Sequence, residues 1–356
     1  MPGASVESHC MISDTLLSLV RCPDCASAFV VAAGVIRCGT CGRTADTTAA
    51  YLDLRTTHET GESTKYLDDA LHADGRQSSI SPPVLSAGIR NDMMRRFLRP
   101  GPSDRLVDLG CGSGRMMLWN SASGAHMVGV DVSPHFAAES LAAVDLVLGD
   151  LRRLPLVDAA FTKAYSFDVA EHLTREGLDM MLGEAARVLA PGGHFFLYSH
   201  VRKRSRLAIG QRAINRCAAF LDRVGLIDLQ QERLRKSDHL NPLANLGELE
   251  EAVGKAGFRI AKIRYYTPLV GAFIENILLR LAEGAMIRRA RQRLARQGQA
   301  PGESVALVRA QGKRLAAGGV SGAVLRALTW LMKIDLVLLG RVKSGPFFVL
   351  LEKIAR

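Results

Sequence analysis

The sequence predicts an α/β protein in which helices cover both faces of a doubly wound, mostly parallel sheet. Two observations support this prediction: apolar strand-like runs alternate with helical stretches across residues 93–266, and several of these runs end in an acidic residue or a glycine turn. Two Cys-x-x-Cys pairs ahead of this region are a third observation, and they predict a small metal-binding module. With 356 residues, of which 48% are hydrophobic, the chain is long enough for one such core with additions.

The first core strand runs into a glycine-rich turn, in the stretch Arg105-Leu-Val-Asp-Leu-Gly-Cys-Gly-Ser-Gly-Arg115. Glycines at positions 110, 112 and 114 allow the backbone to turn and to approach a ligand closely, while the following helix offers free N–H groups. The spacing differs from the Gly-x-Gly-x-x-Gly of dinucleotide sites, and Asp108 would repel a phosphate but suit an ammonium group. The turn therefore predicts a nucleotide-type ligand with a positive charge; a domain for another nucleotide is the alternative.

The next two strands, His126–Asp131 and Val144–Asp150, each end in an aspartate. A carboxylate at the position of Asp131 suits the two hydroxyls of a ribose, because it can accept two hydrogen bonds. In a doubly wound sheet the carboxyl ends of parallel strands meet at one edge, where ligands bind. We therefore expect Asp131 and Asp150 to share a binding site with the glycine turn.

Four further strands complete the predicted sheet. The fourth covers residues 161–167, and the fifth follows a Pro-Gly-Gly turn within residues 188–198. A helical stretch leads into the sixth strand at residues 258–264, and residues 346–353 form the last strand. The sequence therefore predicts a sheet of seven strands.

These strands and loops resemble the class I S-adenosylmethionine-dependent methyltransferases, over residues 93–266 and again from residue 346 to the end. The resemblance implies a Rossmann-like sheet with an antiparallel last strand, and S-adenosylmethionine as the cofactor. It implies that the glycine turn holds the methionine part, that Asp131 binds the ribose, and that Asp150 meets the adenine amine. The implied cofactor residues are Asp108, Gly110, Cys111, Gly112, Asp131, Val132, Asp150, Leu151 and, as an aromatic cover from the segment before the core, Tyr66.

Four of the seven cysteines form two knuckles, Cys22-Pro-Asp-Cys25 and Cys38-Gly-Thr-Cys41. Each Cys-x-x-Cys turn can place two thiolates on one ion, and two turns complete a tetrahedron. Because all four positions are sulfur, no position stays open for water, and we expect a structural zinc ion. A redox pair or disulfides are the alternatives.

This segment resembles the short zinc-binding modules attached to the N-terminus of many bacterial methyltransferases. The chain then turns polar until Pro82-Pro83, which marks a boundary before the core. The expected division is a zinc ribbon at 14–58, a linker and lead-in helix at 59–92, the core at 93–266 with a lid insert at 201–240, a helical insert at 267–344, and the final core strand at 345–356.

The fourth strand leads into Phe167-Asp-Val-Ala-Glu-His-Leu173, where substrate meets cofactor in the fold that the chain resembles. Methyl transfer is an in-line displacement, and a hydroxyl acceptor also needs a base or a metal to remove its proton. His172 suits the base, and Asp168, Glu171 and His172 together suit a divalent metal. The pattern resembles the Glu-x-x-Glu-His of ubiquinone-biosynthesis O-methyltransferases, although its first acid is shorter; a structural role in packing and capping is the alternative.

Two further histidines are candidates for acid–base catalysis. His200 lies just past the fifth strand, and His239 lies in Ser-Asp-His-Leu-Asn-Pro242. Both positions fall where the resembled fold keeps its substrate-facing loops. A solvated loop histidine is the alternative for each.

Both inserts are basic and partly apolar, and the chain has a formal net charge of +11. Such a charge indicates an anionic partner, either nucleic acid or a membrane surface. The apolar segments contain charged residues, which argues against a membrane span. They could lie at a membrane interface, cover an apolar substrate, pair two subunits as a homodimer, or pack on the sheet as an added helical layer.

The expected function is therefore S-adenosylmethionine-dependent methyl transfer, most simply O-methylation of an apolar small molecule such as a lipid, quinone or polyketide-like phenol. An RNA base methyltransferase is one alternative, but the arginines are not interleaved with aromatic residues that stack on bases. A partner-binding protein with a vestigial core is another. The N-terminus has no basic segment followed by an apolar run, so we expect a cytoplasmic protein, with peripheral membrane contact as an option.

Overall fold

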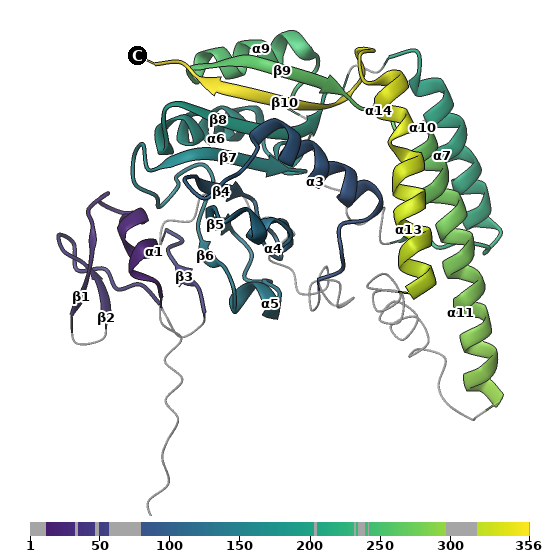
Figure 1. Ribbon diagram of the computed structural model, residues 1–356, viewed down its shortest axis with the longest axis horizontal. Helices are drawn as coiled ribbons and strands as arrows, with labels where there is room; N and C mark the ends of the chain where they lie inside the picture. Colours follow the sequence, from purple (N-terminus) through teal and green to yellow (C-terminus); the bar gives the residue numbers. More distant parts are fainter. Residues whose placement is uncertain are drawn as a thin grey trace, which may run out of the picture.

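The computed structural model describes residues 12–32, 35–46, 50–56, 80–202, 205–230, 233, 239–240, 242–296 and 319–355. Within these ranges, a small N-terminal module and a layer of long helices flank a central sheet on opposite sides (Figure 1). Tyr66, expected to cover the cofactor, lies outside the described residues.

The central sheet has eight strands in the order β3-β6-β5-β4-β7-β8-β10-β9. All pairs from β3 to β8 are parallel, whereas β10 is antiparallel to both β8 and β9, which confirms the predicted fold class. The strands are β3 (Leu52–Asp53), β4 (Arg105–Leu109), β5 (His126–Asp131), β6 (Asp145–Leu148), β7 (Phe161–Phe167), β8 (Leu189–His200), β9 (Phe258–Tyr265) and β10 (Pro346–Lys353).

The strand order reverses between β4 and β7. From β4 the chain moves outward through β5 and β6, and then returns to β7 on the other side of β4. Such a switch point opens a crevice at the carboxyl ends of the two strands. The glycine turn after β4 and residues 168–173 after β7 therefore lie at the same crevice.

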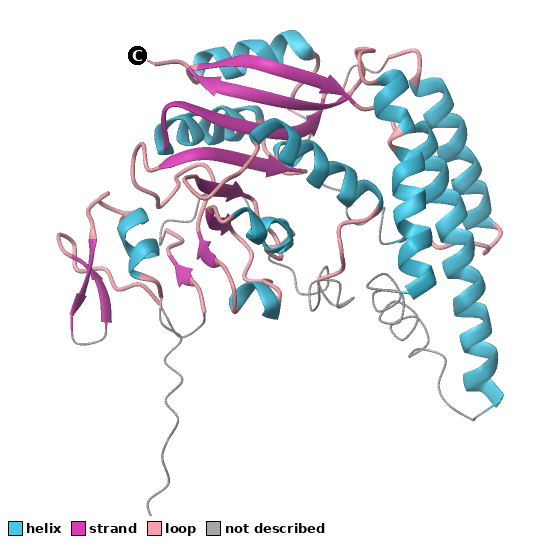
Figure 2. Cartoon of the chain, in the orientation of Figure 1, coloured by secondary structure: helices cyan, strands magenta, loops and turns pink. Residues whose placement is uncertain are grey.

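Both faces of the sheet are covered, as the alternation along β8 shows. Phe195 and Leu197 belong to one apolar cluster, while Phe196 and Tyr198 belong to the other. One face is covered by α6 (Arg175–Val188) and α9 (Leu246–Lys255), and the other by α3 (Leu85–Leu98) and α4 (Arg115–Asn120) (Figure 2). Helix α6 begins where the Thr174 side chain accepts a hydrogen bond from the Gly177 N–H.

The N-terminal module contains α1 (Asp14–Leu19) and a hairpin of β1 (Phe29–Ala32) and β2 (Val35–Cys38). Its last strand, β3, is the eighth strand of the central sheet, which the sequence had not predicted. Leu16, Leu19 and Leu52 belong to the same apolar cluster as the core strands. The module and the core therefore share one hydrophobic interior.

The two inserts form an additional helical layer beside the sheet. The first supplies α7 (Ala208–Arg223), which packs against α10 (Leu269–Phe273) and the π-helical turn η4 (Ile274–Leu278) of the second. The second insert continues with α11 (Leu279–Arg296), α13 (Gly319–Met332) and α14 (Ile334–Leu339). Among the described helices, none combines the length and the apolar character needed to cross a membrane.

Candidate active site and cofactor site

The glycine turn after β4 has the backbone geometry that its sequence predicts. Gly110, Gly112 and Gly114 have φ angles of +83°, +53° and +79°, which side chains with a Cβ rarely adopt. A Cβ on Gly112 would have no atom within 4 Å, so the turn is open on that side. The backbone of this turn can therefore approach a ligand directly.

Asp131 is oriented by two backbone amides. Its carboxylate accepts hydrogen bonds from the Gly112 N–H at 2.7 Å and from the Ser133 N–H at 2.9 Å. These bonds tie the end of β5 to the glycine turn. A carboxylate has about four acceptor positions, so an oriented Asp131 can still accept hydrogen bonds from a diol.

Asp108 is buried beneath the turn, with 3% of its surface exposed. Burial, and then the nearby Asp131, raise the pKa of the Asp108 carboxyl well above its usual range. An ionised Asp108 is therefore costly unless a positive group lies beside it. This is the environment expected for a carboxylate that faces a ligand ammonium group.

The turn after β6 places Asp150 beside Arg152. The Asp150 carboxylate accepts from the Arg152 backbone N–H at 2.8 Å and pairs with its guanidinium, also at 2.8 Å. Leu151 is half-buried between them. If Asp150 contacts an adenine amine as predicted, the amine and Arg152 would share this carboxylate.

Tyr51 is a candidate cofactor residue that the sequence reasoning missed. It precedes β3 and packs edge-on against Phe136, with ring centroids 5.3 Å apart. Phe136 belongs to the loop that follows Asp131 and Val132. The N-terminal module thus supports the loop beside the expected ribose and adenine positions, and no local pattern around Tyr51 signals this contact.

Asp168 is paired with an arginine of the lead-in helix. The Arg90 guanidinium lies 2.8 Å from the Asp168 carboxylate and 4.7 Å from the centroid of the Tyr198 ring. Asp168 also has a positive φ of +53°, an uncommon conformation for a residue other than glycine. Arg90 was not predicted, because its helix was interpreted only as an entry to the core.

Glu171, His172 and His239 come together, although His239 is distant in the sequence. Each offers one ligand atom, and these atoms all lie within 4.8 Å of one another. The rings of His172 and His239 are 4.7 Å apart, and the Glu171 carbonyl accepts from the Leu240 N–H at 2.8 Å. His239 therefore occupies the third position of this group, where the sequence had suggested Asp168.

Glu171 is the buried centre of this group. Its carboxylate accepts a hydrogen bond from the Ser199 hydroxyl at 3.0 Å, and Nδ1 of His200 lies 3.9 Å away. Burial, and then the charge of Asp168, raise the pKa of Glu171 to about 8. Two histidines share one position with this carboxylate and a third lies beside it, and these groups can move a proton or bind a cation.

A cavity of about 920 Å³ lies beside this group. Asp168, Glu171, His200 and His239 line it, whereas His172 does not. The other walls come from α3, α7, α10, η4, α11 and the segment before β10. A smaller hollow of about 230 Å³, between α9 and β9, contains none of the candidate residues.

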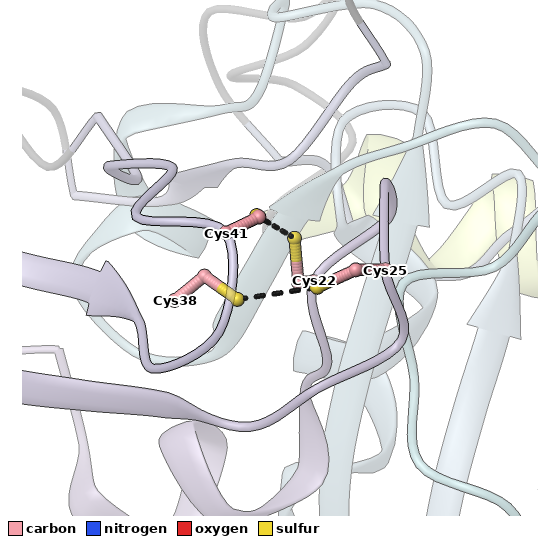
Figure 3. Close-up of side chains that lie close together, drawn as sticks. All are labelled: Cys22, Cys25, Cys38 and Cys41. Carbon is pink, nitrogen blue, oxygen red and sulfur yellow. Dashed lines mark hydrogen bonds between the residues drawn. The ribbon is translucent and has the colours of Figure 1, made fainter.

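The four predicted zinc ligands gather at one point of the N-terminal module (Figure 3). The Sγ atoms of Cys22 and Cys41 are 3.6 Å apart, and those of Cys25 and Cys38 are 3.4 Å apart. A tetrahedral ion with Zn–S bonds of about 2.3 Å implies S–S distances of about 3.8 Å. The four Sγ atoms all lie within 4.8 Å of one another, and these two distances are close to the spacing around a single zinc ion.

The electrostatic environment lowers the pKa of Cys25 and Cys38, whereas burial raises the pKa of Cys22 and the hydrogen bond with Cys38 raises the pKa of Cys41. Hydrogen bonds from the backbone and then the side chain of Ser27 lower the pKa of Cys25 to about 6. The described cysteines are all free, so the structure gives no support to the disulfide alternative.

Comparisons with known proteins agree with this geometry. Residues 107–197 match the family model described as a methyltransferase domain. The chain therefore contains a methyltransferase domain, which agrees with the expected class I, S-adenosylmethionine-dependent type.

Individual relatives are similar over part of their length. The chain is 31% identical over 123 residues to 24-methylenesterol C-methyltransferase 2 of Oryza sativa subsp. japonica, covering 32% of this chain and 33% of that protein. It is 26% identical over 204 residues to the ubiquinone biosynthesis O-methyltransferase of Azorhizobium caulinodans, covering 53% and 75%. The chain thus spans about a third of the length of the sterol relative.

Among solved structures, the fold is similar to phosphoethanolamine N-methyltransferase 2 of Haemonchus contortus in complex with S-adenosyl-L-methionine. The identity is 18%, the TM-score is 0.47, and the similarity covers 82% of this chain and 58% of the other.

Proposed function

We propose that this chain transfers a methyl group from S-adenosylmethionine to a small molecule bound in the 920 Å³ cavity. One contact carries the proposal: Val169 packs directly on Gly110, where an added Cβ would lie only 2.3 Å from Cγ2 of the valine. Val169 stands between Asp168 and Glu171, which line the cavity. The turn that would hold the cofactor and the loop that would face the acceptor are therefore in contact.

O-methylation is the chemistry that the side chains support best. The acceptor oxygen attacks the methyl carbon of the sulfonium, and its proton must pass to a base as the new C–O bond forms. His200 and His239 both line the cavity and are the proposed bases. The ionised form of Glu171, beside His200, would stabilise the imidazolium that results.

A divalent ion held by Glu171, His172 and His239 is the second way to activate the hydroxyl. Two imidazoles and one carboxylate suit zinc and other divalent transition metals, and Ser199 orients the carboxylate from behind. Such an ion would lower the pKa of a bound hydroxyl. The chain's own contribution is to hold the three ligand atoms at this spacing.

The cavity wall favours an acceptor with an apolar body and polar groups. Leu85, Ala272 and Leu279 line it together with Arg212 and Arg280. This mixture suits a phenol or quinol with an apolar substituent better than a plain hydrocarbon. We therefore retain the lipid, quinone or polyketide-like phenol as the acceptor class, with the polar group of the acceptor as a necessary feature.

We also propose that Cys22, Cys25, Cys38 and Cys41 bind a structural zinc ion. All four ligand positions would be occupied by sulfur, so the ion would have no open position for a reactant. Its role would be to hold the β1–β2 hairpin against the chain that leads into β3.

Calorimetry with S-adenosylmethionine and S-adenosylhomocysteine tests the cofactor assignment. We expect micromolar binding of both ligands, and loss of binding in Asp131→Ala, because this carboxylate is the ribose acceptor held by two amides. Asp158→Ala, an exposed carboxylate between α6 and the N-terminal module, is the matched control. Absence of binding by the wild-type chain would contradict the proposal and favour a vestigial core.

Transfer to a panel of phenols and quinols, followed by mass spectrometry, tests the reaction itself. The expected product is heavier by one methyl group and forms only with S-adenosylmethionine. Methylation of a nitrogen or carbon acceptor, with none on oxygen, would overturn the O-methylation assignment while leaving the cofactor site intact.

A further inference from the structure

The outward face of α13 and α14 exposes apolar side chains along its whole length. Trp330, Val337 and Leu338 are 71%, 73% and 70% exposed. Val320 and Val324 near the start of α13, and Leu331 beside Trp330, are also exposed. So many large apolar side chains exposed on two consecutive helices indicate a surface that a partner covers. We call this surface the α13–α14 face; it consists of the exposed residues Val320, Val324, Trp330, Leu331, Val337 and Leu338.

The opposite side of the same helices is fixed against the protein. The Thr329 hydroxyl accepts a hydrogen bond from the Leu85 N–H at 2.7 Å, and Lys333 pairs with Asp92 of α3. Asp335 accepts from the N–H groups of Val270 and Gly271, at the start of α10. Because these contacts set the orientation of both helices, the exposed apolar residues are held outward.

The exposed charged residues within positions 319–343 have a single sign. Arg326, Arg341 and Lys343 are exposed. Asp335 is the only acidic residue between positions 319 and 343, and it is buried. The α13–α14 face is thus apolar, and the exposed charged residues of the segment that carries it, residues 319–343, are all cations.

We propose that the α13–α14 face binds the surface of an anionic lipid bilayer. Apolar residues with a tryptophan and a cationic border are the features of a helix that lies in the membrane interface, and the anionic headgroups complement the three cations. A second copy of the chain, placed on this face by a two-fold axis, would bring the same cations toward one another. No described helix can span the bilayer, so the contact is with the surface.

This proposal goes beyond methyl transfer and does not depend on it. The α13–α14 face is connected to the cavity, because α10 packs on both α13 and α14 and also lines the cavity wall. A chain docked through this face would hold the cavity close to the bilayer, where an apolar acceptor is concentrated.

Vesicle binding of the full chain tests the proposal. The probes are vesicles of phosphatidylcholine alone and vesicles that also contain phosphatidylglycerol, separated by flotation. We expect binding only to the vesicles with phosphatidylglycerol, together with a blue shift of tryptophan emission. The measurement is made in Trp119→Phe, because the chain has only two tryptophans and Trp330 is then the sole reporter.

Two variants distinguish binding through this face from nonspecific binding to vesicles. The double substitution Val337→Glu and Leu338→Glu places carboxylates at exposed positions, where folding should tolerate them, and should weaken partition by roughly tenfold or more. The control is Val30→Glu with Val31→Glu, two exposed valines of β1, which should leave partition unchanged.

Several results would overturn the proposal: no binding to either vesicle type, equal binding to both, or binding that the Val337→Glu/Leu338→Glu variant retains. Self-association of the wild-type chain that this variant abolishes, without vesicle binding, would assign the face to a second copy instead. Asp131→Ala should keep vesicle binding even though it loses the cofactor. A failure of the lipid proposal is therefore distinguishable from a failure of the proposed enzyme activity.

Discussion

Val169 lies so close to Gly110 that a Cβ on the glycine would come within 2.3 Å of its Cγ2 atom. The contact joins the turn after β4 to the loop after β7, the two segments that form the crevice at the switch point of the sheet. A change at either residue should therefore affect both the cofactor site and the acceptor cavity.

We predict that Gly110→Ala loses cofactor binding and lowers the free energy of unfolding by about 2–4 kcal/mol, since it combines a positive φ with a steric clash. Gly112→Ala is the matched control. It shares the positive φ, but its Cβ would meet open space, so a smaller loss of about 1–2 kcal/mol is expected. Denaturant unfolding and calorimetry check both; equal losses for the two variants would show that Val169 does not matter.

Cys22→Ser combined with Cys38→Ser should destabilise the whole chain and not only the N-terminal module. Both cysteines are buried in the apolar cluster that also contains the core strands, and β3 pairs with β6. We expect loss of bound zinc and a single unfolding transition at a lower temperature. The free energy of unfolding should fall by more than about 3 kcal/mol. Cys217→Ser, at an exposed position on α7, should change neither. A core transition that stays at the wild-type temperature would contradict this prediction.

Tyr51→Ala should weaken binding of S-adenosylmethionine by a factor of about 2–10, the equivalent of one edge-on aromatic contact. The reason is that Tyr51 supports Phe136 in the loop after Asp131, so its loss leaves that loop less ordered. Tyr51→Phe keeps the ring contact and should bind normally. Calorimetry of the two variants measures the effect, and equal affinity for both would remove Tyr51 from the cofactor site.

Asp108→Asn should stabilise the ligand-free chain while it weakens cofactor binding. Burial raises the pKa of Asp108 in the folded state, so its contribution to stability is complete in acid and declines as the pH rises above the usual range of an aspartate. Because asparagine does not titrate, the free energy of unfolding of the variant should depend less on pH over that range. Unfolding measured from acid to neutral pH, with calorimetry at neutral pH, tests both effects. An unchanged pH dependence would show that Asp108 is not buried as an acid.

His239→Ala should lower kcat by about a hundredfold or more while cofactor binding stays normal. The same variant should contain one equivalent less of any divalent metal if Glu171, His172 and His239 hold an ion, with the ribbon zinc retained. His194→Ala, in the middle of β8 and not among the residues that line the cavity, is the control histidine. Normal turnover in His239→Ala would leave His200 as the base.

The sequence predicted the geometry of the glycine turn and the gathering of the four cysteines, because each depends on residues that are close along the chain. The glycines after β4 set the backbone of their own turn, and each Cys-x-x-Cys pair determines its own knuckle. Asp131 was predicted from its position at the end of a strand, and the structure places its carboxylate on the glycine turn. Apolar strand-like runs were also enough to predict seven of the eight strands of the sheet.

The acceptor side could not be predicted to the same extent. Asp168, Glu171 and His172 are adjacent in sequence and were grouped for that reason, but Asp168 pairs with Arg90, and His239 joins Glu171 from the first insert. The sequence also did not show which apolar residues of α13 and α14 stay exposed. In a largely apolar helix, the residue pattern does not separate the buried side from the exposed side.

The sequence by itself determined the class of fold, the cofactor turn and the four cysteines, since local spacing dictates turn geometry and ligand number. Only the tertiary structure decided that Tyr51 supports the loop of Phe136, that His239 meets Glu171, and that the module and the core share one interior. The physical reason is that such contacts depend on how whole elements pack. The residues around a position do not indicate which distant residue will contact it in the folded chain.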